Sequence, residues 1–203
     1  MTGLWWTLGG YLAGSIPFAL LVSRMMRLPD PRTYGSGNIG ATNVLRSGSR
    51  RAALFTLLGD VMKGWIVVLA ARAAEMPEEI VALAGAAAFA GHVFSIWLRF
   101  HGGKGVATAA GVLIAFDWRL GCAVLALWLV VVLATRYSSL AALVAACAAP
   151  VVAWYLHGTG PVFAATLGMA IVLVLRHHAN IGKLLRGEES RVGVKRSNPP
   201  EAP

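Results

Sequence analysis

Seven apolar runs, separated by short polar segments, constrain the fold of this chain more than any other feature. Hydrophobic residues make up 57% of the 203 positions and charged residues only 13%, against about 25% charged in a soluble domain. Most of the runs approach the ~20 residues that cross a bilayer. The pattern therefore predicts an all-α, polytopic bundle of transmembrane helices over residues 4–26, 52–71, 80–98, 106–116, 120–135, 140–156 and 161–175.

The distribution of Lys and Arg predicts the orientation of these helices. Six arginines and one acid, Asp30, surround the connection between the first two runs, so this connection is expected in the cytoplasm. The run 106–116 is short enough to be re-entrant. If it crosses, 15 of the 18 basic residues lie inside and only Arg72 and Arg119 lie outside. The charges thus predict seven crossings, N-terminus outside and C-terminus cytoplasmic; five remain open if a second segment also fails to cross.

The net charge of +9 indicates contact with cytoplasm and anionic headgroups in a chain this apolar. No basic domain lies outside the apolar runs, so we expect no nucleic-acid binding. Residues 1–191 are predicted to form a single integral membrane domain, and residues 192–203 a disordered cytoplasmic tail. The N-terminus has no basic region of the signal-peptide kind, so the first run is expected to persist as a mature helix.

The first of three unusual polar segments is a glycine-rich stretch at residues 35–43, followed by Arg46. Glycines let backbone N–H groups approach an anion, and an Arg guanidinium binds phosphate oxygens in pairs. The stretch also matches the dinucleotide motif GxGxxG, but no strand precedes it and a membrane helix follows, so we reject that reading. The alternative is a plain flexible loop. The candidate ligands here are Gly35, Ser36, Gly37, Asn38, Gly40, Thr42, Asn43 and Arg46.

The second segment reads Gly102-Gly103-Lys104-Gly105 and opens the short run 106–116. Amide groups at the start of a helix favour an anion, and Lys104 adds a positive charge. The segment is not a P-loop, because Gly105 stands where that motif has Ser or Thr. The alternative is a tight turn whose lysine follows the positive-inside rule.

The third segment closes the last apolar run with Arg176, His177 and Asn180. His177 and Asn180 are three residues apart and are expected to share a helical face. Zinc would need further organised ligands that the spacing does not supply, so no metal site and no cofactor are predicted. The alternative is a basic helix end at the lipid headgroups.

Three ionisable residues lie inside apolar runs, namely Asp60, Lys63 and His92. Such residues are costly in a membrane and favour a functional role. The alternative for Asp60 and Lys63 is a mutually neutralised pair that fixes helix packing. Asp60 and His92 are general-base candidates by type, but neither has a visible partner to orient it. We expect His92 to be structural or positioning, and Asp60 to anchor Lys63 or the first loop.

Taken together, these residues resemble the bacterial membrane glycerol-3-phosphate acyltransferases that use acyl-phosphate as donor. The resemblance covers about residues 10–190. It rests on Gly14-Ser15-Ile16-Pro17, the stretch 35–43, Asp60, Lys63-Gly64, Gly91-His92-Val93-Phe94-Ser95, residues 102–108, Arg176-His177, Asn180-Ile181 and Gly187-Glu188-Glu189.

The resemblance implies transfer of a fatty acyl group from acyl-phosphate to the sn-1 hydroxyl of glycerol 3-phosphate, giving lysophosphatidic acid and phosphate. It also implies that the enzyme lies in the bacterial inner membrane with its active site facing the cytoplasm. It implies membrane lipid as surroundings, with an upstream acyl-phosphate synthase and a downstream lysophosphatidate acyltransferase as partner enzymes. The expected catalytic residues are Ser36, Asp60, His92, Lys104, His177 and Asn180. The expected substrate contacts are the first-loop ligands above, Gly102, Gly103, Lys104, Gly105, His177 and Asn180.

The main alternative is a small transporter of a phosphorylated or other anionic metabolite. Intramembrane Asp60, Lys63 and His92 would suit transport, and broken helices are common there. A transporter also needs polar groups along a path to the other side, yet the runs 120–133 and 140–156 are almost purely apolar. The polar motifs instead gather on one predicted side, which favours an enzyme at the membrane surface.

Overall fold

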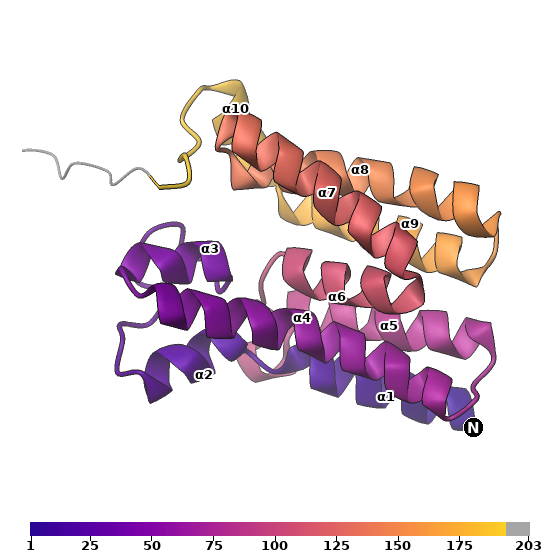
Figure 1. Cartoon of the computed structure of the whole chain (residues 1–203). Coiled ribbons are helices and arrows are strands. Elements are labelled where there is room, and N and C mark those ends of the chain that lie inside the picture. Colours follow the sequence, from indigo (N-terminus) through magenta and orange to yellow (C-terminus); the bar gives the residue numbers. More distant parts are fainter. Residues whose placement is uncertain (194–203) are drawn as a thin grey trace, which may run out of the picture.

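The computed structural model describes residues 1–193, and all of the regular structure among them is helical. Figure 1 shows helices that run roughly along one direction, with α3 and α10 at the same end of the bundle. The elements are α1 (Thr2–Ser15), α2 (Phe18–Met25), α3 (Ala41–Val44), η1 (Leu45–Ser47), α4 (Arg50–Ala73), α5 (Glu78–Val93), η2 (Ile96–Leu98), α6 (Val106–Phe116), α7 (Trp118–Thr135), α8 (Ser138–His157), α9 (Pro161–Arg176) and α10 (His178–Leu185).

Four of the helical spans in residues 1–193 are long and apolar enough to cross a membrane, and the number rises to six if each of two bent helix pairs counts as one span. The all-α prediction is confirmed. Helix α6, with 11 residues, has the bounds predicted for the short run, 106–116. The predicted tail begins at Val192, and its residues 194–203 lie outside the described part of the chain.

The first apolar run is not the single helix that its length predicts. It is divided into α1 and α2, which meet at an angle of 40°. The cause is Pro17, which lacks an N–H group and prevents the residue before it from continuing the helix. Ile16 accordingly has an extended ψ of 119°. A second bend, of 56°, separates α9 from α10 at His177.

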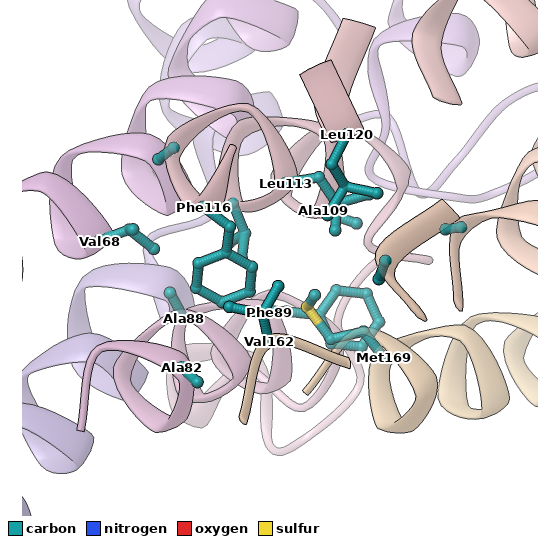
Figure 2. Close-up of a cluster of buried hydrophobic side chains, with 14 of the residues drawn as sticks. Val68, Ala82, Ala88, Phe89, Ala109, Leu113, Phe116, Leu120, Val162 and Met169 are labelled. Atoms are coloured by element: carbon teal, nitrogen blue, oxygen red, sulfur yellow. The ribbon is translucent and has the colours of Figure 1, made fainter. Parts of the chain in front are cut away.

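Helix α5 lies at the centre of the bundle and packs against α1, α4, α6 and α9. Its small residues allow backbones to approach closely, as is usual between membrane helices. A Cβ atom on Gly14 of α1 would collide with the carbonyl oxygen of Ala88. Phe89 and Phe116 fill the adjoining core, where Figure 2 shows them among Leu113, Val162 and Met169. Helix α7 is different, because most of its length is exposed, as expected for a lipid-facing helix.

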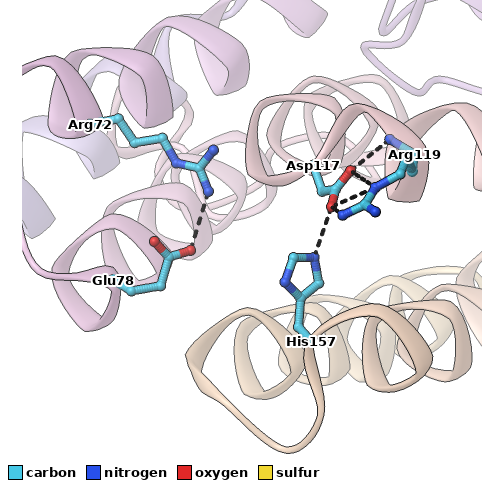
Figure 3. Close-up of polar contacts among 5 residues, drawn as sticks. All are labelled: Arg72, Glu78, Asp117, Arg119 and His157. Atoms are coloured by element: carbon cyan, nitrogen blue, oxygen red, sulfur yellow. Dashed lines mark hydrogen bonds and ion pairs between the residues drawn. The ribbon is translucent and has the colours of Figure 1, made fainter.

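Polar contacts tie the connections together at the end of the bundle opposite to α3 and α10 (Figure 3). Arg72, at the end of α4, pairs with Glu78, at the start of α5. Asp117, the single residue between α6 and α7, accepts hydrogen bonds from Arg119 and lies 3.3 Å from the imidazole of His157, at the end of α8. The Arg119 guanidinium lowers the pKa of Asp117 to about 2. The Asp117–His157 contact places the C-terminal end of α6 beside the end of α8, and Arg72 of α4 lines one hollow together with residues 114–119.

Candidate active site

The three polar segments that stand out in the sequence meet at one end of the bundle. The Nζ atom of Lys104 donates a 2.5 Å hydrogen bond to Oδ1 of Asn180. Nη2 of Arg176 donates to the carbonyl of Gly102 at 3.2 Å. Nη2 of Arg46 donates to Oγ of Ser190 at 2.5 Å. Residues far apart in the chain therefore form one cluster, as expected if they serve a single site.

The first glycine-rich loop is organised by Asn43, which is 2% exposed. Its amide nitrogen donates to the carbonyls of Pro31 and Tyr34, and its Oδ1 accepts from the backbone N–H of Ser36 and from Arg46. Because all of these contacts are inside the protein, Asn43 shapes the loop from within. The side chains of Ser36, Thr42 and Arg46 are exposed around it.

Glycine is required at position 35 for two reasons. Its φ of +61° is one that L side chains rarely adopt, and a Cβ atom there would collide with Oδ1 of Asn43. Gly37 has a similar φ of +67°. These two positive φ angles turn the chain tightly, and the N–H of Ser36 donates to Oδ1 of Asn43 while that of Gly37 donates to the carbonyl of Tyr34.

The second loop is held against the end of α5 by its own backbone. The N–H of Gly102 donates to the carbonyl of Val93 at 3.0 Å, and that of Gly103 donates to the carbonyl of His92 at 3.1 Å. Gly105, with a φ of +86°, lies directly over the ring of Phe89. The loop is thus fixed on both sides of Lys104, and the lysine side chain extends across to Asn180.

Positive charge exceeds negative charge around Lys104. Burial lowers the pKa of the Lys104 ammonium below its ordinary value of 10.5, and the carboxylate of Glu189 opposes that change. Three further cations, Lys183, Arg46 and Arg176, lower the pKa of Lys104 again. The charged groups that most affect Lys104 are thus three cations and one carboxylate, an environment that favours a phosphate anion.

The third segment supplies neutral groups next to these cations. His177 occupies the bend between α9 and α10 and is 2% exposed. Its Nδ1 lies 2.8 Å from the carbonyl of Leu173, so we assign the proton to Nδ1 and the role of acceptor to Nε2. Asn180, one turn further on, joins Lys104 to Glu189 through the two ends of its amide.

No role was predicted for the residues that hold this cluster from the C-terminal side, although Glu189 belongs to one of the motifs that carry the resemblance. Oε1 of Glu189 accepts hydrogen bonds from Nδ2 of Asn180 at 2.8 Å and from Oγ of Ser139 at 2.9 Å. Ser190 binds Arg46, and the N–H of Val192 donates to the carbonyl of Arg136. One signal was available: Glu188 and Glu189 are the only acids in an otherwise basic segment.

Asp60, Lys63 and His92 lie apart from this cluster, in the interior. They are 2%, 6% and 5% exposed. Oδ1 of Asp60 is 2.9 Å from Nζ of Lys63 and 3.4 Å from Nδ1 of His92. The ion pair that we considered for Asp60 and Lys63 is therefore present, and no described hydrogen bond joins Asp60 to the first loop.

The cluster offers no group of metal ligands among residues 1–193. No group of three His, Cys, Asp or Glu side chains in that range is placed to hold a metal ion. A hollow of about 470 Å³ lies at the other end of the bundle, where it is lined by Arg72 and residues 114–119. It contains none of the candidate residues, so the site is defined by its contacts and charges.

Comparison with known proteins agrees with this picture. The family model described as glycerol-3-phosphate acyltransferase matches residues 4–187. A glycerol-3-phosphate acyltransferase of Burkholderia lata is 56% identical over 188 residues, which cover 92% of this chain and 89% of the relative. One of Cupriavidus pinatubonensis is 52% identical over 97% of this chain and 99% of the relative.

Two solved structures have the same fold. They are crystal structures of PlsY, an integral membrane glycerol 3-phosphate acyltransferase, in a glycerol 3-phosphate form and in a lysophosphatidic acid form. The TM-scores are 0.89 and 0.86, both at 31% sequence identity. The first alignment covers 95% of this chain and 96% of the solved one.

Proposed function

The chain belongs to the glycerol-3-phosphate acyltransferase family, and on this premise we propose that the cluster around Lys104 is its active site. The protein is a membrane enzyme that acylates glycerol 3-phosphate to lysophosphatidic acid. The observation that supports this location is the excess of cations around Lys104. The acceptor carries a phosphate monoester, and its product keeps that group, so the site needs fixed positive charge.

We assign roles from the contacts in the cluster. Arg46 binds the phosphate of glycerol 3-phosphate, and the exposed hydroxyl of Ser36 supplies a neutral donor beside it. Lys104 binds phosphate oxygens at the reacting end, and Asn180 and Glu189 hold its ammonium in place. Nε2 of His177 accepts a hydrogen bond from the glycerol hydroxyl groups. Asn43 shapes the first loop from within, and the other residues of Gly35–Gly40 and Gly102–Gly105 line the phosphate sites.

The donor in this proposal is acyl-phosphate, which combines a phosphate with a lipid chain. Apolar side chains lie exposed in the loop that leads to Lys104, among them Phe94, Trp97 and Phe100. This juxtaposition suits a substrate whose chain stays in the bilayer while its phosphate reaches the glycines. The proposal also implies one enzyme that supplies acyl-phosphate and a second acyltransferase that consumes lysophosphatidic acid.

We expect purified protein to use acyl-phosphate in strong preference to acyl-CoA. The glycine loops are compact, and no extended segment among residues 1–193 is available to hold an adenine nucleotide. The measurement is lysophosphatidic acid formed from labelled glycerol 3-phosphate with each donor at equal concentration. Similar turnover with both donors would contradict the choice of donor, and absence of product with either would contradict the proposed function. Flux of the labelled substrate across proteoliposomes tests the transporter alternative.

Transfer proceeds directly in our proposal, without an acyl-enzyme. The sn-1 oxygen of glycerol 3-phosphate attacks the acyl carbonyl carbon, the bond from that carbon to the phosphate oxygen breaks, and inorganic phosphate leaves. The hydroxyl proton passes to an oxygen of the departing phosphate, so no protein base is needed. Lys104 and the loop amides stabilise the negative charge that develops.

Rapid-quench experiments test direct transfer. When enzyme is mixed with labelled acyl-phosphate alone, we expect no label on the protein, because no nucleophile forms an ester with the acyl group. Adding glycerol 3-phosphate should give labelled product without a burst. Label trapped on any Ser, Thr or Cys would show a two-step reaction, whose kinetic sign is accumulation of an acyl-enzyme.

We propose seven crossings with the active site in the cytoplasm, the N-terminus outside and the membrane as the bacterial inner membrane. The contacts at the two ends of the bundle support the short α6 as a crossing. Its N-terminal end follows Lys104 in the site, and its C-terminal end carries Asp117, which contacts His157 at the opposite end. The positive-inside distribution supports the orientation.

Cysteine labelling in intact cells tests this orientation. Both native cysteines, Cys122 and Cys147, are exposed, so they are first replaced by Ala. An impermeant thiol reagent should label Arg119→Cys in intact cells, and His101→Cys and Gly187→Cys only after the membrane is opened. All three positions are exposed. Labelling of His101→Cys in intact cells would contradict the proposed orientation, because it would place the second loop outside the cell.

A further inference from the structure

The proline elbow between α1 and α2 leaves backbone carbonyls without their helical partners, and two other segments bind them. Nζ of Lys63, from α4, donates to the carbonyl of Ile16 at 3.0 Å. Oγ of Ser95, from the loop after α5, donates to the carbonyl of Ser15 at 2.6 Å. Both side chains are buried. The elbow is therefore a contact point for α4 and for the loop that carries Lys104.

Lys63 fits closely into the elbow. Its ammonium lies 5.9 Å from the ring centroid of Phe18, the first residue of α2, in addition to its bond with Ile16. Asp60, one turn earlier on α4, neutralises the charge at 2.9 Å. A buried ammonium without such a carboxylate is strongly unfavourable, so the burial of Lys63 depends on Asp60.

The same carboxylate connects the elbow to the glycine loop. Oδ1 of Asp60 lies 3.4 Å from Nδ1 of His92. The opposite nitrogen of that ring, Nε2, lies where a side chain on residue 103 would stand, so the imidazole packs directly against the backbone of Gly103. The carbonyl of His92 also accepts the N–H of Gly103. His92 thus supports the residue before Lys104 with both its ring and its backbone.

We propose that Lys63, Asp60 and His92 form a positioning unit that fixes the Gly102–Gly105 loop relative to the proline elbow, and through the loop sets the place of the Lys104 ammonium. Ser95 forms a second link between the same two parts. None of these side chains bonds to Arg46, Lys104 or Asn180 among the described residues, so they act through the loop and touch no substrate. The inference rests on the proposed function, because its readout is the transfer reaction.

The unit predicts a separation of stability from activity. Removing one charge alone would leave the other buried and unpaired and would destabilise the protein, whereas removing both is often neutral for folding. The test variant is therefore the double substitution Asp60→Leu with Lys63→Met. The matched control is Thr56→Val, on the same helix, because Thr56 is fully buried and its hydroxyl has no hydrogen-bond partner.

The double variant should fold with nearly the thermal stability of Thr56→Val, yet its kcat should be about 10–100-fold lower, since misplacing a catalytic group by about 1 Å costs on that order. The KM for glycerol 3-phosphate should change by less than about threefold, because the position of Arg46 does not depend on the unit. A loss that acts through Lys104 alone falls mainly on kcat. A kcat within about twofold of the control would overturn the proposal.

A second variant keeps the test decisive if the double variant does not fold. Ser95→Ala removes only the hydroxyl that binds Ser15, and it should lower kcat severalfold while Ser95→Thr, which keeps a hydroxyl, restores part of the loss. A wild-type kcat for Ser95→Ala would then overturn the proposal. Wild-type enzyme is assayed in parallel with acyl-phosphate and glycerol 3-phosphate. If it is inactive, the proposed function fails, whereas an active wild type with fully active variants refutes the positioning unit alone.

Discussion

Lys104→Met should lower kcat by about 10²–10³-fold, the loss found when one preorganised donor to a developing negative charge is removed. Met has a similar length but carries no charge and no donor, so in the proposed mechanism the departing phosphate loses the cation that stabilises its charge. Asn180 also loses the donor to its Oδ1. The measurement is steady-state turnover of acyl-phosphate and glycerol 3-phosphate at saturating concentrations of both.

The control for this variant is Arg186→Met, which removes one cation from the same end of the protein. Arg186 is exposed and pairs with the exposed Glu188, and such surface pairs contribute little. The kcat of Arg186→Met should therefore stay within about twofold of wild type, a change that corresponds to only about 0.4 kcal/mol in the activation free energy. Equal losses in both variants would show that total charge matters, and that Lys104 has no special position.

The pH dependence follows from the same lysine. Only the protonated ammonium carries the positive charge that attracts phosphate, and burial lowers the pKa of Lys104 below 10.5. The kcat/KM for glycerol 3-phosphate should therefore fall as the pH rises through that lowered pKa, while substrate phosphate, whose second ionisation is near ~6, stays dianionic. Lys104→Arg keeps its charge to much higher pH, so the alkaline decline should disappear in the residual activity of that variant.

The sequence predicts the helical architecture well because hydrophobicity over ~20 residues is a local property. The bounds of α6 match the apolar run at residues 106–116. The division of the first run has an equally local cause: Pro17 was visible in the sequence, but the apolar run continued through it to Met26. A proline in a membrane helix either bends it or divides it, and the outcome depends on whether neighbours bind the freed carbonyls. Lys63 and Ser95 do so here.

The candidate site was predictable only in part. Glycine with Arg or Lys at a helix end indicates an anion site from local chemistry alone, and this pattern made Arg46 and Lys104 candidates. The partners that hold these cations come from distant segments. Ser190 is 144 residues from Arg46 in the chain, and Ser139 is 50 residues from Glu189. No spacing rule relates such residues, since their proximity is a result of how the helices pack.

Arg46→Ala should lower kcat/KM for glycerol 3-phosphate by about 10–100-fold. A hydrogen bond from a charged group contributes about 1.5–3 kcal/mol, and alanine removes both the charge and the fork of donors. The guanidinium of Arg46 donates to Ser190 from one nitrogen and to Asn43 from the other. These two bonds orient the guanidinium before the substrate arrives. The loss should appear mainly in the KM for glycerol 3-phosphate, with the KM for acyl-phosphate nearly unchanged.

Two further variants separate geometry from charge at this position. Arg46→Lys keeps the charge but offers a single ammonium, so it should recover only part of the activity if the phosphate is bound through two nitrogens. Arg50→Ala removes an exposed arginine four residues away, at the start of α4, and should leave both KM values unchanged. Full activity in Arg46→Lys would show that the contact needs only a single charge. Normal kinetics in Arg46→Ala would remove Arg46 from the acceptor site, because a bound phosphate dianion cannot lose a charge-assisted partner without a measurable loss of affinity.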